Sequence, residues 1–253
     1  GCQVDRISIV KRIRLFFRAR RGALALLLIP VVAILVRLPG TWQNLPFVFR
    51  PDEPTLVNLA TRLFTEGSLN PRFFSIPGGM IYLLGLLYLL MLLGGMLCGA
   101  FPGWAAGMKV LAAGTYPRAP GGGIIDRLPT RGAPVAYIVG RLFSVMLGAL
   151  TAWWTARLAE RLAGRRAAWL AGGFLALNAF HAANSVLVTA DVACSAFLAW
   201  FLLVLANGRS PRTAGIALGL AVACKYTGGI GLYLWPLGLL PGRRQSRSGS
   251  VGR

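Results

Sequence analysis

Six ionisable side chains are notable because they lie beside or within apolar segments. They are Asp52, Glu53, Arg141, His181, Asp191 and Lys225. Ionisable groups at membrane depth are costly, and they are candidates for function by default. A carboxylate within hydrogen-bond reach of a substrate hydroxyl can act as a general base. A fixed arginine or lysine can stabilise the negative charge of a phosphate.

The three acids also have a purely structural interpretation. Asp52 or Glu53 could cap a helix that begins near Pro54, and Asp191 could cap the next apolar segment with help from Thr189. Adjacent carboxylates do not share a face of a helix or a strand. We therefore expect Asp52 and Glu53 to have separate roles.

The cations and the histidine have structural alternatives as well. Arg141 could snorkel to the membrane interface, and Lys225 could pair with a backbone carbonyl that a broken helix leaves free. His181 is the only histidine of the chain. It could be a hydrogen-bonded polar residue inside a helix bundle. Because no second histidine or nearby cysteine accompanies it, we predict no metal site there.

The composition is that of a membrane protein. Of the 253 residues, 56% are hydrophobic and only 13% are charged. Soluble domains are about a quarter charged. The net charge of +20 does not indicate nucleic-acid binding, because the basic residues form short runs between apolar segments. The four cysteines are isolated, so neither a metal site nor a disulfide framework is predicted.

The chain is predicted to be an all-α polytopic membrane protein. A polar loop at residues 39–79 separates the first apolar segment from the second, and a Gly/Pro-rich loop is expected at 102–133. The last apolar segment contains Lys225 and several glycines, so we expect two broken pieces there. The apolar segments lie at 22–38, 80–101, 134–156, 167–188, 192–207 and 214–240.

The two ends of the chain are polar. Residues 1–21 contain seven Lys and Arg residues and precede an apolar segment with no small-residue cleavage site. This pattern predicts an uncleaved first span with a basic cytoplasmic N-terminus. Residues 241–253 are predicted to be a polar disordered tail. The chain starts with Gly1, and we expect it to be the N-terminal part of a longer protein.

The loop at residues 39–79 is expected to contain an amphipathic helix at residues 54–66. Leu56, Leu59, Ala60, Leu63 and Phe64 repeat at helical spacing. Proline at position 54 suits a first helical turn, and glycine at position 67 suits a C-terminal cap. We expect this helix to lie in the membrane interface.

The basic clusters define the expected topology. They occur at the N-terminus, at 157–166, at 209–212 and at 243–247. All four fall on the cytoplasmic side if residues 80–101 are re-entrant or lie along the outer interface, and if residues 214–240 cross out and back. This arrangement, which we prefer to a full crossing of 80–101, places Asp52, Glu53 and Asp191 on the outer face. Lys225 and Arg141 then lie close to that face.

Several motifs, in this order, resemble the GT-C glycosyltransferases. The first is RPDE at 50–53, followed by NPRFF at 70–74, and the second is GRLFS at 140–144 with GALT at 148–151. RLAGRR at 161–166, the series His181, Ser185 and TAD at 189–191, and GLA at 219–221 with KYT at 225–227 complete the set. The closest group is the protein O-mannosyltransferase and aminoarabinose transferase type. The resemblance covers residues 22–240.

The resemblance implies a GT-C-like bundle of transmembrane helices whose first outer loop carries interfacial helices. It also implies transfer of a hexose or pentose from a polyprenyl-phosphate carrier to a hydroxyl acceptor. Asp52 is the expected base and Glu53 a second catalytic candidate. Arg141, Lys225, Asp191 and His181 are the candidates for binding the substrate or its phosphate. The cell membrane is the implied location, with membrane lipid and the lipid-linked donor as partners.

Two other classes of function stay open. A transporter or carrier would also use charges and broken helices in the membrane, but it predicts an internal repeat, and none is visible. A catalytically inactive, truncated relative is the third possibility, because members of the GT-C family are longer than this chain. No cofactor is predicted, and a requirement for a divalent metal is left open. The acceptor is left open among protein, lipid and glycan.

Overall fold

The computed structural model describes residues 24–45, 48, 50, 52–113, 134–208 and 210–239. All regular elements in these residues are helices, which confirms the all-α prediction. The basic segment 1–21, the tail 241–253 and most of the Gly/Pro-rich loop lie outside them. The elements are α2 (Leu28–Arg37), η1 (Leu38–Trp42), α3 (Asp52–Thr65), α4 (Gly79–Leu97), α5 (Trp104–Ala113), α6 (Val135–Leu177), α7 (Ala179–Ser185), α8 (Ala190–Ala206), α9 (Pro211–Cys224), η2 (Tyr226–Ile230) and α10 (Gly231–Leu239).

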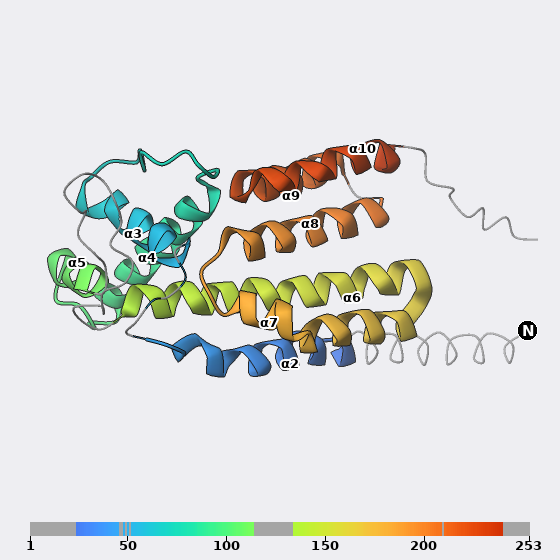
Figure 1. Ribbon diagram of the computed structural model, residues 1–253, viewed down its shortest axis with the longest axis horizontal. Helices are drawn as coiled ribbons and strands as arrows, with labels where there is room; N and C mark the ends of the chain where they lie inside the picture. The colour runs from blue at the N-terminus through green and yellow to red at the C-terminus, as the bar shows by residue number, and fades with distance from the viewer. Residues whose placement is uncertain are drawn as a thin grey trace, which may run out of the picture.

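The element α6 is the centre of the bundle, and it consists of two helices. It runs the length of the molecule and then turns back on itself (Figure 1). The turn is at Gly164, whose φ of 83° and ψ of −177° are outside the helical region. Glycine is required at such a position because a Cβ disfavours that backbone conformation. The turn lies within the predicted basic segment 157–166.

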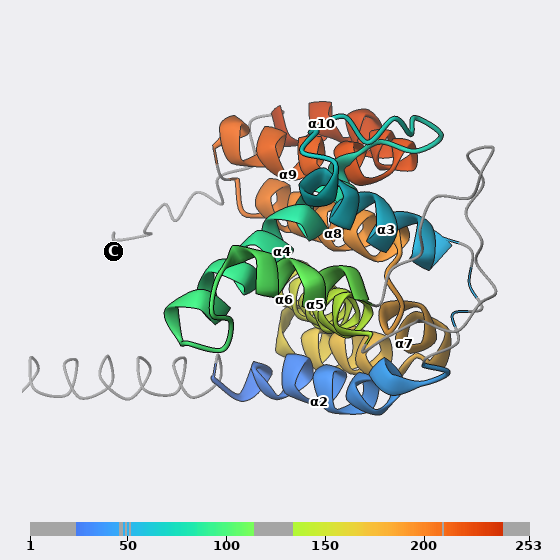
Figure 2. The same ribbon diagram turned by 90° about the vertical axis from the view of Figure 1, so that its left-hand side faces the viewer.

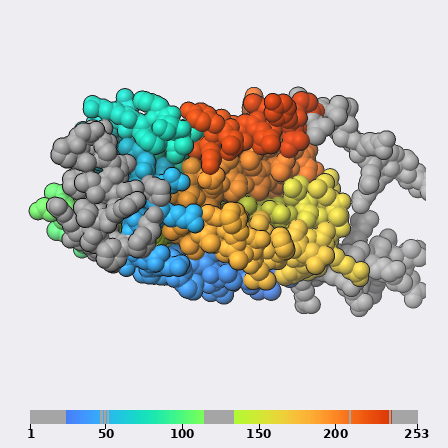
Figure 3. Space-filling view, viewed as in Figure 1, coloured from blue at the N-terminus to red at the C-terminus, as the bar shows by residue number. Residues whose placement is uncertain are grey.

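The other long helices pack on both sides of α6. Its alanines at 149, 152 and 156 form one buried apolar cluster with Ile29 of α2 and with Leu26, which lies just before α2. On the other side α8 packs against α6, and α9 packs against α8. The space-filling view shows α2, the returning part of α6 and the α8–α10 segments stacked from bottom to top (Figure 3).

A second group of helices covers one end of this bundle. Figure 2 looks at that end and shows α3, α4 and α5 lying across it, while α6 is seen end on. Tyr88 of α4 attaches the group to α6, because its hydroxyl donates to the carbonyl of Ala136 at 2.9 Å. The backbone of Gly79 lies directly against α9, since a Cβ there would be 2.3 Å from the carbonyl oxygen of Ala223. We refer to this end of the bundle as the α3 end.

Within the described residues, three helical stretches are long and apolar enough to cross a membrane, namely Leu24–Trp42, Gly79–Leu97 and Val135–Leu177. The pair α7 and α8 adds a fourth if the two count as one span bent by 115°. Stretches of this length and hydropathy are typical of a membrane protein. Length and composition allow α4 to cross the membrane, and the re-entrant or interfacial placement of residues 80–101 stays a prediction.

Three sequence predictions are wrong in detail. The segment 167–188 is not one span, because Asn178 has an extended backbone and separates α6 from α7. The segment 102–133 is not entirely a loop, because α5 occupies Trp104–Ala113. The loop helix α3 is not one-sided: Asn58 and Thr61 are buried together with its apolar residues. The close packing of α4 and α5 on α3 explains the last difference.

Candidate active site

The two adjacent acids begin α3, and they point to different surroundings. Asp52 is exposed, whereas Glu53 is fully buried. The helix starts here because Pro54 suits its first turn and because carboxylates favour the positive end of the helix dipole. Since neighbouring residues on a helix face different directions, the sequence separates one solvent-facing carboxylate from one buried carboxylate. This difference in burial is the structural reason to expect separate roles for Asp52 and Glu53.

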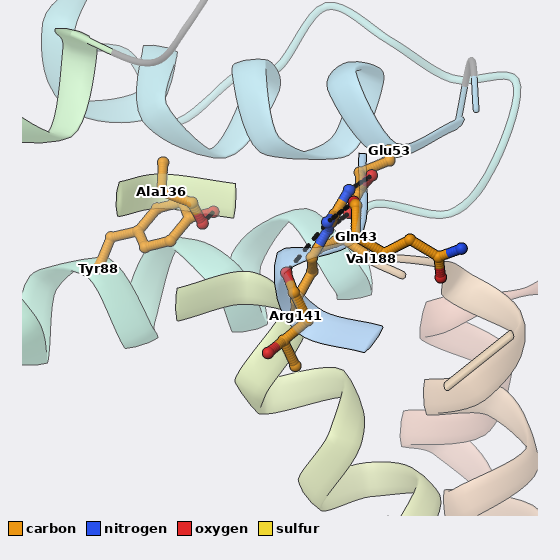
Figure 4. A network of polar contacts seen from close by, with 7 residues as sticks. Gln43, Glu53, Tyr88, Ala136, Arg141 and Val188 are labelled. Carbon is orange, nitrogen blue, oxygen red and sulfur yellow. Dashed lines mark hydrogen bonds and ion pairs between the residues drawn. The ribbon is translucent and has the colours of Figure 1, made fainter. Parts of the chain in front are cut away.

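Glu53 forms a buried bidentate ion pair with Arg141 of α6. Arg141 donates from Nε to Oε1 at 2.7 Å and from Nη2 to Oε2 at 2.8 Å (Figure 4). Its Nη1 donates to the carbonyls of Thr41 and Gln43, at 3.0 Å and 2.8 Å. The guanidinium is therefore surrounded by protein acceptors. These contacts hold Arg141 in place, and its contact with phosphate stays a prediction.

Glu53 also holds the segment that leads into α8. Its Oε1 accepts a hydrogen bond from the backbone N–H of Val188 at 3.2 Å. This segment can approach α6 because Gly140 has no side chain; a Cβ there would be 2.8 Å from Val188. The Glu53–Arg141 pair therefore joins the start of α3, α6, the chain after η1 and the start of α8. Because the pair contacts all of these segments, it holds the start of α3 beside the start of α8.

A second ion pair is formed by Asp191 and Lys225. The Lys225 Nζ lies 2.5 Å from Asp191 Oδ1, and both side chains are partly exposed, at 33% and 62%. Asp191 is in the first turn of α8, whose N-cap residue is Thr189. The structural alternative, in which Asp191 is the N-cap, therefore does not hold. Lys225 has an extended backbone between α9 and η2, which confirms that the last apolar segment is broken at this residue.

Asp52 shares a cavity with this second pair. The cavity has a volume of about 210 Å³, and its lining residues come from α3, from the chain between α3 and α4, from the start of α8 and from Lys225. Three of the six residues selected from the sequence, Asp52, Asp191 and Lys225, thus line one cavity although they are far apart in the chain. The other lining residues are Thr55, Leu56, Phe73, Ser75, Ile76 and Ala190. We call this the α3 cavity.

Another cavity is lined by the Glu53–Arg141 pair itself. It has a volume of about 250 Å³, and it is lined by Arg50, Gln43, Asn44, Ala183, Val186 and Leu187 in addition to the pair. Arg50 is exposed and carries a cation that the sequence analysis did not select. The sequence signal that could have identified Arg50 is its position two residues before Asp52, in the RPDE motif.

His181 belongs to a different cluster. Its Nδ1 lies 2.8 Å from Nη2 of Arg37, which is fully buried in the first span. Arg37 also donates to the carbonyls of Ala33, Leu175 and Ala176. The last two are at the end of α6, where carbonyls lack partners within the helix. Arg37 thus connects α2, α6 and α7, a role that the sequence analysis missed although an arginine ending an apolar segment was visible.

The polar groups of the α3 cavity suit proton transfer and anion binding better than metal binding. Asp52 and Asp191 are its two carboxylates, and the second is already paired with a cation. In the described residues no group of three or more His, Cys, Asp and Glu side chains could hold a metal ion. An exposed carboxylate close to an ammonium can accept a proton while the ammonium attracts a phosphate.

The comparisons with known proteins agree with the resemblance found in the sequence. A family model described as dolichyl-phosphate-mannose-protein mannosyltransferase matches residues 134–239. No curated protein and no solved structure matches the chain. The matched region runs from the start of α6 to α10, so it contains Arg141, Asp191 and Lys225 but not Asp52. Over residues 134–239 the chain is similar to this mannosyltransferase family, which supports a membrane glycosyltransferase of the GT-C type.

Proposed function

We propose that this protein transfers a sugar from a polyprenyl-phosphate carrier to a hydroxyl acceptor at the α3 cavity. The observation that carries the proposal is the meeting of Asp52, Asp191 and Lys225 at one cavity of about 210 Å³. The family match supports glycosyl transfer in general. The cavity adds a solvent-facing carboxylate and a cation, which are the two kinds of group that this reaction requires.

In the proposed reaction Asp52 is the general base. It accepts the proton of the acceptor hydroxyl while that oxygen bonds to the anomeric carbon of the sugar. The bond between the anomeric carbon and the phosphate oxygen breaks, and its electron pair leaves with the polyprenyl phosphate. Because the acceptor attacks from the face opposite the phosphate, the configuration at this carbon is inverted.

Lys225 is the proposed partner of the departing phosphate. Its side chain is 33% exposed and lines the cavity, and the contact with Asp191 holds its ammonium in place. A cation that is already oriented stabilises developing charge without further reorganisation. The buried Glu53–Arg141 pair has a different part in the proposal: it fixes the start of α3, and therefore the direction of Asp52. His181 has no part in this scheme.

The proposed location is the cell membrane, with the α3 end on the outer face and the N-terminus in the cytoplasm. The turn of α6 supports this orientation, because it carries Arg161, Arg165 and Arg166 at the end of the bundle away from α3. Short basic loops remain on the cytoplasmic side. The donor would then reach the α3 cavity from the outer leaflet.

The test is transfer of labelled sugar from polyprenyl-phosphate donors by the full-length protein in membranes. The proposal predicts that Asp52→Asn reduces transfer by at least about 10²-fold, the size expected for a general base. Glu66→Gln is the matched control, because Glu66 is an exposed acid directly after the other end of the same loop helix. It is expected to keep full activity. Each assay is run with and without a metal chelator, which tests the need for a divalent ion.

Two outcomes would contradict the proposal. Equal transfer by the wild type and by Asp52→Asn, at equal membrane levels, would remove Asp52 from the mechanism. No transfer by the wild type from any polyprenyl-phosphate donor would favour a carrier or an inactive relative.

A further inference from the structure

A further cavity in the described part of the protein lies away from the α3 end. Its volume is about 710 Å³, and it lies between α2, α6 and α8. Arg157, on its wall, is 16 residues after Arg141 in the continuous first part of α6. At about 1.5 Å per residue, this separation is about 24 Å along the helix. We call this the tryptophan cavity, and it is separate from the proposed active site.

The apolar wall of this cavity is formed by aromatic and leucine side chains from three helices. Trp154 of α6 stacks on Trp200 of α8, with ring centroids 5.9 Å apart and an angle of 22° between the ring planes. Tryptophan is enriched where a membrane protein meets the boundary between hydrocarbon and headgroups. The remaining apolar lining consists of Trp153, Leu24, Leu27, Leu203 and Val204.

The polar wall carries more positive than negative charge. Arg157 and Arg161 lie one helical turn apart and both line the cavity, with Glu160 as its single acid. Arg157 Nη1 pairs with Glu160 Oε2 at 2.6 Å. Arg161 donates only its Nε, to the carbonyl of Ala206 at 3.3 Å, and no partner of its two Nη groups is found among the described residues. These Nη groups can donate to a further anion.

We propose that the tryptophan cavity binds an anionic phospholipid. The phosphate lies against Arg161, and the acyl chains follow the tryptophan and leucine wall between α2 and α8. The volume is within the range of about 300–1,000 Å³ that is usual for ligand sites. Basic pockets between membrane helices on the cytoplasmic side are known to suit anionic headgroups. The basic turn at Gly164 lies next to this cavity and attracts the same lipids.

The test is lipid binding to the purified full-length protein, measured by native mass spectrometry during titration with phosphatidylglycerol or phosphatidylcholine. We expect the wild type to prefer phosphatidylglycerol. Arg161→Gln is expected to raise the Kd for phosphatidylglycerol about tenfold, because one charge-assisted hydrogen bond is lost. Its Kd for phosphatidylcholine is expected to change less. Trp200→Ala is expected to weaken binding of both lipids, because it removes part of the wall that both sets of acyl chains contact.

Arg166→Gln is the matched control, because Arg166 is an exposed arginine of the same turn that does not line the cavity. It is expected to leave both values unchanged. Equal affinity of wild type and Arg161→Gln for phosphatidylglycerol would overturn the proposal, as would no preference between the two lipids. An equal loss of phosphatidylglycerol affinity in Arg166→Gln would show that the basic turn attracts the lipid diffusely and that no specific site exists. None of these lipid-binding measurements depends on sugar-transfer activity.

Discussion

Two neighbouring carboxylates of this chain have opposite environments. One environment suits a structural role, and the other suits the proposed chemistry. Glu53 has both oxygens on the guanidinium of Arg141 and is fully buried, whereas Asp52 faces a cavity that also contains Lys225. A buried pair of this kind fixes the position of the segments that it joins more than it increases the net stability of the fold. Removal of one partner, however, leaves an unpaired charge inside the protein.

Glu53→Gln is therefore expected to lower the free energy of unfolding by about 3–5 kcal/mol, because Arg141 is left buried without its carboxylate. Denaturant titration of the purified protein in detergent measures this change in the free energy of unfolding. Glu160→Gln is the control, since Glu160 also pairs with an arginine but is partly exposed. Its loss is expected to be about 0.5 kcal/mol or less. Similar losses in the two variants would contradict the positioning role of Glu53.

Lys225 provides a prediction about the donor. Lys225→Gln is expected to reduce the kcat/KM for the polyprenyl-phosphate donor by about 10²-fold, because a preorganised cation is lost. The KM for the acceptor is expected to stay close to that of the wild type. Kinetic assays with Lys109→Gln as a control serve here, because Lys109 is an exposed lysine of α5. Equal effects on donor and acceptor would indicate that Lys225 has only a structural role.

The residues of the candidate site could largely be selected from the sequence, but their pairing could not. A charge within an apolar segment is visible in one dimension, so Arg141, Asp191 and Lys225 were found. The partners depend on which helices pack together. His181 was grouped with the site, whereas it binds Arg37, because the sequence does not show that α7 packs beside α2.

The helices that position the site depend on close backbone approach. Gly79, at the start of α4, allows the backbone of α4 to touch α9 next to Lys225. The existence and type of most helices followed from apolar runs and from Pro and Gly positions; Gly67, for example, has the positive φ of 62° expected of a helix C-terminal cap. The break at Asn178 and the burial of α3 depend on tertiary packing, and the sequence pattern does not contain them.

Gly79→Ala is expected to lower the free energy of unfolding by about 1–3 kcal/mol, because the new Cβ would overlap backbone atoms of Ala223 and Cys224. Gly94→Ala is the matched control in the same helix, since no neighbouring atom lies within 4 Å of a Cβ built there. It is expected to be neutral or stabilising, because alanine favours a helix more than glycine does. Chemical unfolding of the two variants compares them directly, and equal effects would contradict the close approach of α4 and α9.

At the scale of the whole molecule, the two ends of the bundle have different chemistry. The α3 end gathers Asp52, Asp191 and Lys225 at one cavity, while the turn of α6 gathers arginines beside the tryptophan cavity. A membrane glycosyltransferase needs one end for its reaction, and a basic end on the opposite side fixes its orientation. Both cavities carry cations that suit a lipid phosphate, and the proposed function assigns the lipid-linked sugar to the α3 cavity.

The most direct measurement is photolabelling of the full-length protein in membranes with a photoreactive polyprenyl-phosphate sugar, followed by mapping of the labelled peptides. The proposed function predicts label in the segments around residues 73–76, 190–191 and 225, which line the α3 cavity. Excess unlabelled donor is expected to remove this label. Label confined to the segments around Arg157 and Trp200, or label that unlabelled donor does not displace, would contradict the assignment of the α3 cavity as the active site.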